Sequence, residues 1–219
     1  MDIPKIIKEH HQAMIDKGFY DCPECEGEGY YGSQPIQTCS TCNGSRIDPN
    51  KNIGELLMLI VSELGEALEA HRKGEMNCDI DDIFENITSS NPILSNAGLK
   101  QMELYKSFFP FEIADVFLRL FDLCGYLEIQ PKEYPLLEMQ CFNNIGQEFL
   151  WVTGMLANLP GFKSYYDAID DISKEVESIS LVIKRLERFC ESKDIPIEKH
   201  ILAKMAYNKT RPHKHGKEY

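Results

Sequence analysis

The sequence lacks any long hydrophobic run. No stretch of about 18 consecutive apolar residues, the length that a membrane-spanning helix needs, occurs among its 219 residues. Residues 1–17 are charged and contain no apolar segment of the kind found in signal peptides, so no leader is expected. We therefore predict a protein without a membrane partner.

Positive charge is also scarce. The chain has 23 Lys and Arg residues against 35 Asp and Glu residues, which gives a formal net charge of −12 at pH 7. A general affinity for nucleic acid needs a basic surface, so we do not expect nucleic acid as a partner. An acidic protein can still bind a polyanionic substrate where metal ions and a few local cations reverse the charge of the site.

The cysteines do not have the spacing of a disulfide framework. Four of the eight form two CxxC pairs, and the others are scattered along the chain at Cys78, Cys124, Cys141 and Cys190. This usage is typical of a reducing compartment and of one metal site. The sequence therefore predicts a cytoplasmic protein.

The two CxxC pairs predict a structural zinc site. Two pairs joined by a segment with Gly and Tyr suit a tetrahedral ion with four thiolate ligands, which leaves no position open for water. Glycines after each pair permit positive φ, so that backbone N–H groups can turn toward the sulfurs. A short hairpin is expected over residues 30–38, and a redox role for either pair is the alternative. The ligands are Cys22, Cys25, Cys39 and Cys42.

The repeated CxxCxG pattern resembles the zinc modules of DnaJ-type cochaperones. Those proteins carry four such pairs and this chain carries two, so the resemblance extends to one zinc site. We interpret the chain as an N-terminal helix (1–18), a zinc-knuckle insertion (19–47) and a helical domain (48–219).

The helical domain is predicted from apolar residues that recur with helical periodicity, so the fold class is all-α, an antiparallel helical bundle. Asn52 and Glu55 form a capping-box pattern at the start of the first long helix, and Gly74 ends it. Residues 75–107 are less regular and are interpreted as a long excursion with room for one short helix. The predicted long helices are 53–73, 111–127 (or from 106), 142–159, 164–192 and 196–207.

Two of these helices carry paired carboxylates in otherwise apolar runs. Glu63 and Glu66 are three residues apart, as are Glu112 and Asp115, so each pair projects from one helix face. Two such helices packed face to face bring four carboxylates together, which is a known way to build a divalent-metal site. Without a cation, four like charges in apolar surroundings would repel and protonate. The alternative is that they are boundary carboxylates of amphipathic helices.

This carboxylate pattern resembles the ExxE…ExxD signature of the all-α nucleoside triphosphate pyrophosphohydrolases, the MazG-like and dimeric dUTPase group. Lys204-x-x-x-Asn208-x-x-Arg211 resembles the KxxxNxxR tail of MazG-like members. The resemblance covers residues 53–127 and the last two dozen residues, but not the zinc knuckles. Two departures are the long spacing between the carboxylate pairs and Ser62, where the family often has a second Glu.

The resemblance implies a bundle of MazG-like type that cleaves a nucleoside triphosphate to its monophosphate and pyrophosphate, in nucleotide-pool housekeeping. Mg²⁺ prefers carboxylate and phosphate oxygens, although Mn²⁺ could replace it, and Glu63, Glu66, Glu112 and Asp115 would hold it. The cation would neutralise the leaving pyrophosphate and lower the pKa of a water. Glu63 or Glu66 would accept the proton of that water, and the sequence does not distinguish them.

The C-terminal segment supplies the candidate substrate-binding residues. Lys204 and Arg211 can bind the β- and γ-phosphate oxygens, and Asn208 lies one turn from Lys204. Lys214 and His215 are further candidates. The competing function is a non-catalytic, zinc-containing helical interaction protein whose carboxylates bind metal without turnover. A homo-oligomer, either dimer or tetramer, is compatible with both.

An internal duplication is a further hypothesis. Ile113-x-x-Val116-x-x-Arg119 matches Ile179-x-x-Val182-x-x-Arg185 in spacing, and Ile53-Gly54 matches Ile145-Gly146. Residues 142–195 would then be a degenerate second copy without carboxylates, and the chain would be a pseudo-dimer with one active site. A chance alignment of two amphipathic helices is the alternative. In this alignment the four carboxylates correspond to Met155, Asn158, Ser178 and Leu181.

Overall fold

The computed structural model describes residues 1–32, 36–132, 142–159 and 173–216, and these residues are mostly helical. Within them the chain forms eight α-helices, one short 3-10 helix and one two-stranded antiparallel hairpin. The all-α prediction is therefore confirmed at the level of fold class. The elements are α1 (Ile3–Asp16), β1 (Tyr30–Tyr31), β2 (Gln37–Thr38), α2 (Ile53–Lys73), α3 (Ile80–Ile87), α4 (Pro92–Tyr105), α5 (Phe109–Tyr126), α6 (Ile145–Ala157), α8 (Ser173–Ser192), α9 (Ile197–Lys209) and η1 (His213–Gly216).

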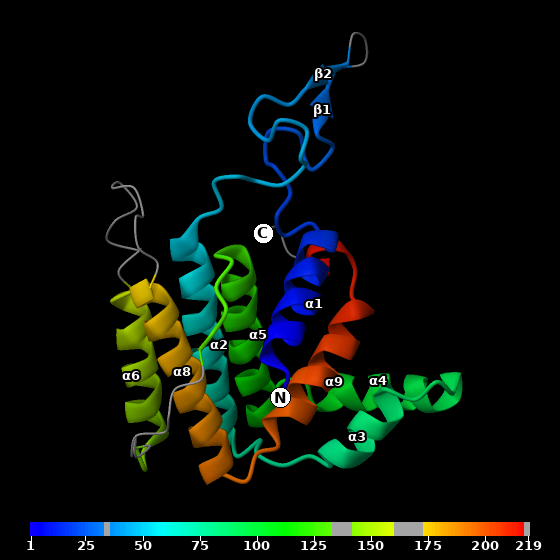
Figure 1. The fold of residues 1–219 in the computed structure, drawn as a ribbon. Helices are drawn as coiled ribbons and strands as arrows, with labels where there is room; N and C mark the ends of the chain where they lie inside the picture. The colour runs from blue at the N-terminus through cyan, green and yellow to red at the C-terminus, as the bar shows by residue number, and fades with distance from the viewer. Residues whose placement is uncertain (33–35, 133–141, 160–172, 217–219) are drawn as a thin grey trace.

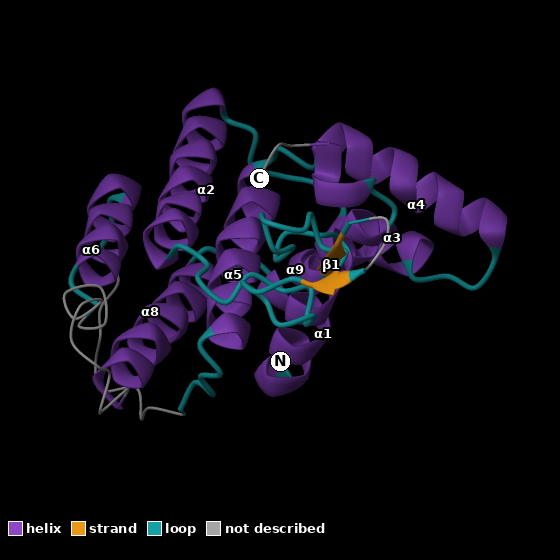
Figure 2. Ribbon diagram, turned by 90° about the horizontal axis from the view of Figure 1, so that it is seen from above, coloured by secondary structure: helices purple, strands orange, loops and turns teal. Residues whose placement is uncertain are grey.

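The helices are arranged around α2 and α5, which pack side by side at the centre (Figure 1). Helices α6 and α8 pack on one flank of this pair, and α1 and α9 pack against α5 on the other. Figure 2 shows the same arrangement from above, with α3 and α4 beyond α9. The cysteine-bearing hairpin projects from the top of the bundle (Figure 1). The N-terminal helix α1 thus belongs to the same helical body as the later helices.

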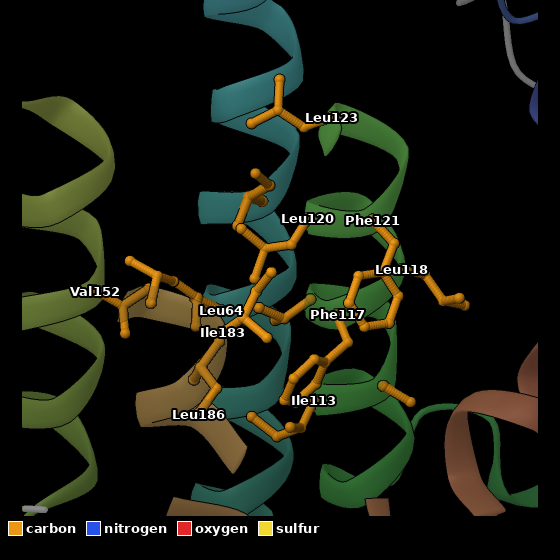
Figure 3. Packing of buried hydrophobic residues seen from close by; sticks show 14 of the residues in the cluster. Leu64, Ile113, Phe117, Leu118, Leu120, Phe121, Leu123, Val152, Ile183 and Leu186 are labelled. Carbon is orange, nitrogen blue, oxygen red and sulfur yellow. The ribbon is translucent and has the colours of Figure 1, made fainter. Parts of the chain in front are cut away.

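Helix α5 is the central element because it is apolar on almost every side. Its buried residues run from Phe109 to Cys124 with few interruptions, and a helix that is hydrophobic all round needs partners on all faces. Figure 3 shows Ile113 and Phe117 of α5 in one cluster with Leu64 of α2 and Ile183 of α8. No helix in the described part of the chain is both long and apolar enough to cross a bilayer.

Predicted helix boundaries are confirmed where the capping chemistry is local. The Asn52 side chain accepts a hydrogen bond from the backbone N–H of Glu55 at 3.3 Å, which starts α2. Gly74 adopts a φ of +77° and ends the same helix. The third predicted long helix begins three residues later than expected, at Ile145, because the side chain of Asn144 accepts from the backbone N–H of Gln147. Residues 164–172 of the fourth predicted helix lie outside the described residues.

Residues 75–107 contain two helices, α3 and α4, so the prediction of an irregular excursion with one short helix was wrong. The side chains of Asp79 and Asn91 cap the two helices, and Pro92 occupies the first turn of α4. The helices cross closely, since a Cβ on Gly98 would lie 2.4 Å from the backbone nitrogen of Ile87.

The packing of the two helix pairs in the duplication hypothesis is partly similar. Helix α6 packs against α8 as α2 packs against α5. The matched arginines both pair with a glutamate of the neighbouring helix, Arg119 with Glu63 and Arg185 with Glu148. Glu148, however, aligns with Leu56, two turns before the Glu63 position. The duplication stays a prediction.

The Glu148–Arg185 pair gives a testable stability prediction. Glu148 is 0% exposed and Arg185 is 5% exposed, and the guanidinium also lies 4.4 Å from the ring centre of Trp151. Removing one partner leaves a buried charge uncompensated, so Arg185→Met should lower the free energy of unfolding by about 3–5 kcal/mol. Urea denaturation measures this loss.

The matched control is Arg188→Met, which breaks an exposed pair with Glu191 on the same helix and should cost less than about 1 kcal/mol. The double variant Arg185→Met, Glu148→Leu should recover most of the loss because no buried charge remains. Equal effects of Arg185→Met and Arg188→Met would contradict the prediction.

Candidate functional site

The four predicted zinc ligands form a compact buried cluster. Their sulfurs all lie within 4.8 Å of one another, with 3.9 Å between Cys22 and Cys39 and 3.7 Å between Cys25 and Cys42. Four sulfurs about 2.3 Å from a tetrahedral zinc ion lie about 3.8 Å apart, whereas a disulfide needs about 2.0 Å. The cluster could therefore hold a metal ion such as zinc.

The backbone around the cluster supports thiolates, as the glycine positions predicted. Gly29 adopts a φ of +79° and donates its N–H to the sulfur of Cys25 at 3.1 Å. Burial alone would raise the pKa of Cys42, but backbone N–H groups of Arg46 and Gly44, with neighbouring thiols, lower it to about 7. Strands β1 and β2, at the two ends of the predicted hairpin, pair antiparallel; residues 33–35 lie outside the described residues.

The second site is a pocket of about 250 Å³ between the helices. It is formed by α1, α2, α5 and α9, with the segments that follow α1, α4 and α9. Seven of the residues predicted from the sequence for metal and substrate line it, although they lie up to 148 positions apart in the chain: Glu63, Glu66, Glu112, Asp115, Lys204, Asn208 and Arg211.

Three of the four predicted carboxylates meet closely in this pocket. Glu63, Glu112 and Asp115 each offer an oxygen, and these oxygens all lie within 4.8 Å of one another. Ligands on opposite sides of Mg²⁺ are about 4.2 Å apart, so small side-chain movements suffice to enclose one divalent cation. Glu66 lines the same pocket but is exposed and lies outside this trio.

The carboxylates carry the electrostatic signature of such a cluster. Burial raises the pKa of Glu112 to about 8, and Asp115 adds to the shift while Lys204 opposes it. Burial and the charge of Asp115 also raise the pKa of Glu63, against the attraction of Arg119. The raised pKa values agree with the expectation that like charges in apolar surroundings protonate unless a cation is bound.

Cations of α5 and α9 lie directly beside these carboxylates. Lys204 is buried, with its Nζ 2.6 Å from Asp115 Oδ2 and donating to the carbonyl oxygen of Lys106 at 2.8 Å. Arg119 Nε lies 3.1 Å from Glu63 Oε1. The side-chain oxygen of Asn208 is buried and has no hydrogen-bond partner among the described residues. The site therefore joins acidic and basic groups with an unused amide oxygen.

Three basic residues of this pocket were not among the predicted site residues. Arg119 follows Asp115 by one helical turn, so its position on the carboxylate face could have been found from the spacing. Lys106 and His10 come from segments with no local pattern that links them to the site. Burial lowers the pKa of His10 to about 4, so its imidazole is neutral at pH 7.

Of the last two predicted substrate-binding residues, only Lys214 can be placed, and it does not line the pocket in the described part of the chain. The backbone N–H of Lys214 donates to the carbonyl oxygen of Lys17 at 2.8 Å, and Lys214 is absent from the described lining. The side chain of His215 lies outside the described residues. The neighbouring His213 instead lies 3.3 Å from Asp21, which ties the C-terminal segment to the base of the cysteine-bearing hairpin.

Comparison of the chain with protein-family models, curated proteins and solved structures found no match.

Proposed function

We propose that the protein is a Mg²⁺-dependent nucleoside triphosphate pyrophosphohydrolase, which converts a (d)NTP to the (d)NMP and pyrophosphate. One observation carries this proposal: carboxylates of α2 and α5 line the same pocket as Lys204 of α9 and Arg211 in the segment that follows it. Carboxylates alone would suit a metal-binding protein, and cations alone an anion site. Their combination suits a polyphosphate that is bound together with a divalent cation.

The acidic part of the pocket is the proposed metal site. Glu63, Glu112 and Asp115 would hold Mg²⁺, with Glu66 nearby. When bound, the ion would neutralise the charge of the leaving pyrophosphate and make a water more acidic. For the cysteine cluster we propose zinc in a structural role, because all four ligand positions are thiolates. Cysteines that bind a metal instead of forming disulfides are typical of a reducing compartment, so we place the protein in the cytoplasm.

The basic part would bind and orient the triphosphate. Lys204 already contacts Asp115, so a phosphate oxygen near the metal ligands would also be near its ammonium group. Arg211 and Lys106 line the same pocket and can contact further phosphate oxygens. The buried oxygen of Asn208 can accept a hydrogen bond from a sugar hydroxyl or from a bound water.

The proposed reaction is attack of water on the α-phosphorus. The oxygen of the water forms a bond to the α-phosphorus while the bond to the bridging oxygen breaks and pyrophosphate leaves. The proton of the water passes to a carboxylate, and the sequence left Glu63 and Glu66 as candidates. Glu63 is paired with Arg119, whereas no ion pair to another described residue is found for Glu66. Glu66 is therefore the better-placed base.

The function is tested by incubating the purified protein with a panel of dNTPs and NTPs, with Mg²⁺ or with EDTA. We expect pyrophosphate and nucleoside monophosphate in equal amounts, and only when Mg²⁺ is present. Release of orthophosphate and a nucleoside diphosphate would place the cleavage at the wrong bond. No turnover of any nucleotide would favour the alternative, a non-catalytic, zinc-containing helical interaction protein.

A further inference from the structure

A second pocket of about 230 Å³ adjoins the first one. The two pockets share Phe19 and Arg119 as lining residues, so they are neighbours. The second pocket lies along the N-terminal half of α2, beside the two ends of the cysteine-bearing insertion. It is lined by Phe19, Tyr20, Lys51, Glu55, Leu56, Met58, Leu59, Arg119 and Asp122.

We propose that this second pocket holds the nucleobase of the substrate, and that it selects a base with an exocyclic amino group. The inference rests on the proposed function, because it assigns the base to one pocket and the triphosphate to the other. Arg119 stands between the two and could contact the α-phosphate or the sugar.

The size and lining of the second pocket suit a single ring system. Pockets for drug-sized ligands measure about 300–1,000 Å³, so a pocket of about 230 Å³ fits a smaller group. Phe19 and Tyr20 supply aromatic surface, and Leu56 and Leu59 supply aliphatic surface. Aromatic and aliphatic lining of this kind favours a heteroaromatic ring, because every base has a π-face that can stack.

The polar groups of the second pocket favour a hydrogen-bond donor on the base. Asp122 is 4% exposed, and its Oδ1 lies at hydrogen-bond distance, 2.8 Å, from His11 Nδ1. An ionised carboxylate only accepts hydrogen bonds, so Asp122 and Glu55 would attract an amino group and repel a carbonyl oxygen. Lys51 uses one proton on the carbonyl oxygen of Phe19 at 3.0 Å. Its other protons can reach a ring nitrogen or carbonyl beside that amino group.

The metal-holding insertion forms one wall of this pocket. Phe19 and Tyr20 precede the first cysteine pair, and Lys51 follows the second. The two ends are joined by the Lys51–Phe19 hydrogen bond and by a bond from the backbone N–H of Asp48 to the carbonyl oxygen of Tyr20 at 2.8 Å. Tyr20 also stacks on Tyr126 of α5, with ring centres 5.7 Å apart. A metal ion that closes the insertion would therefore also keep the wall in place.

The test uses the variant Leu59→Trp, which fills the second pocket, and the matched control Leu150→Trp on the exposed face of α6. Calorimetry with Mg²⁺ measures binding of an α,β-methylene dNTP and of inorganic tripolyphosphate. Leu59→Trp should bind the nucleotide about tenfold more weakly or worse, since base stacking contributes about 1–3 kcal/mol. Its affinity for tripolyphosphate and both affinities of the control should match the wild type.

The outcomes separate the two proposals. If the wild type binds neither ligand, the proposed function fails and the base pocket fails with it. If the wild type binds both ligands and Leu59→Trp binds the nucleotide equally well, the base pocket is overturned while the function stands. A wild type that prefers uracil or thymine over the amino-bearing bases would overturn the assigned selectivity. Asp122→Asn should reduce a preference for amino-bearing bases, because the amide also offers a donor.

Discussion

Asp115→Asn is expected to lower Mg²⁺-dependent pyrophosphate release by about 10³-fold or more, since a bound cation contributes several kcal/mol of transition-state stabilisation. Asp115 is one of the three carboxylates that meet within 4.8 Å, and it also pairs with the buried Lys204. Its replacement removes a metal ligand and the group that orients a phosphate-binding cation. Pyrophosphate release is measured at saturating nucleotide over a range of Mg²⁺ concentrations.

Circular dichroism accompanies this assay, because the helical content of Asp115→Asn should be unchanged. Asp81→Asn is the matched control, since Asp81 is an exposed carboxylate on α3 that pairs with Lys199 and is not among the described lining residues. Glu66→Gln tests the proposed base, and it should abolish turnover. Wild-type turnover in both Asp115→Asn and Glu66→Gln would refute the site.

Cys25→Ser is expected to reduce bound zinc from about one ion per chain to a small fraction. Zinc-finger peptides bind Zn²⁺ with an apparent free energy of about 10–16 kcal/mol, and much of this free energy drives their folding. The four cysteines form a small core of their own, apart from the main helical core. The insertion should therefore unfold while the helices remain. Metal analysis and limited proteolysis between residues 19 and 47 measure the two effects.

Cys78→Ser is the control, because Cys78 is a half-buried free cysteine outside the cluster. We expect Cys25→Ser to lower the stability of the insertion and to change kcat little. The catalytic carboxylates lie on α2 and α5, outside the insertion. The KM for nucleotide should rise if the wall of the second pocket is lost. A stable Cys25→Ser protein with a full complement of zinc would contradict the four-cysteine assignment.

Features that depend on near neighbours could be predicted from the sequence. The spacing of Glu63 and Glu66 puts both side chains on one helix face wherever that helix lies, and the same holds for Glu112 and Asp115. The capping of α2 by Asn52 is likewise a contact across three residues. Asp79 and Asn91 cap α3 and α4 by the same kind of local contact. Residues 75–107 were nevertheless predicted to be mostly irregular, because polar capping residues also occur in loops.

Which side chains are available, and how each set faces along its own helix, follows from the amino-acid sequence alone. The packing of the helices is what makes Glu63, Glu112 and Asp115 meet, leaves Glu66 outside the trio, and puts the ends of the cysteine-bearing insertion beside a second pocket. Helical periodicity and metal-ligand spacing act over only a few residues. The contact of Asp115 with Lys204 is instead set by how whole helices pack, and that packing depends on apolar surfaces distributed over the entire chain.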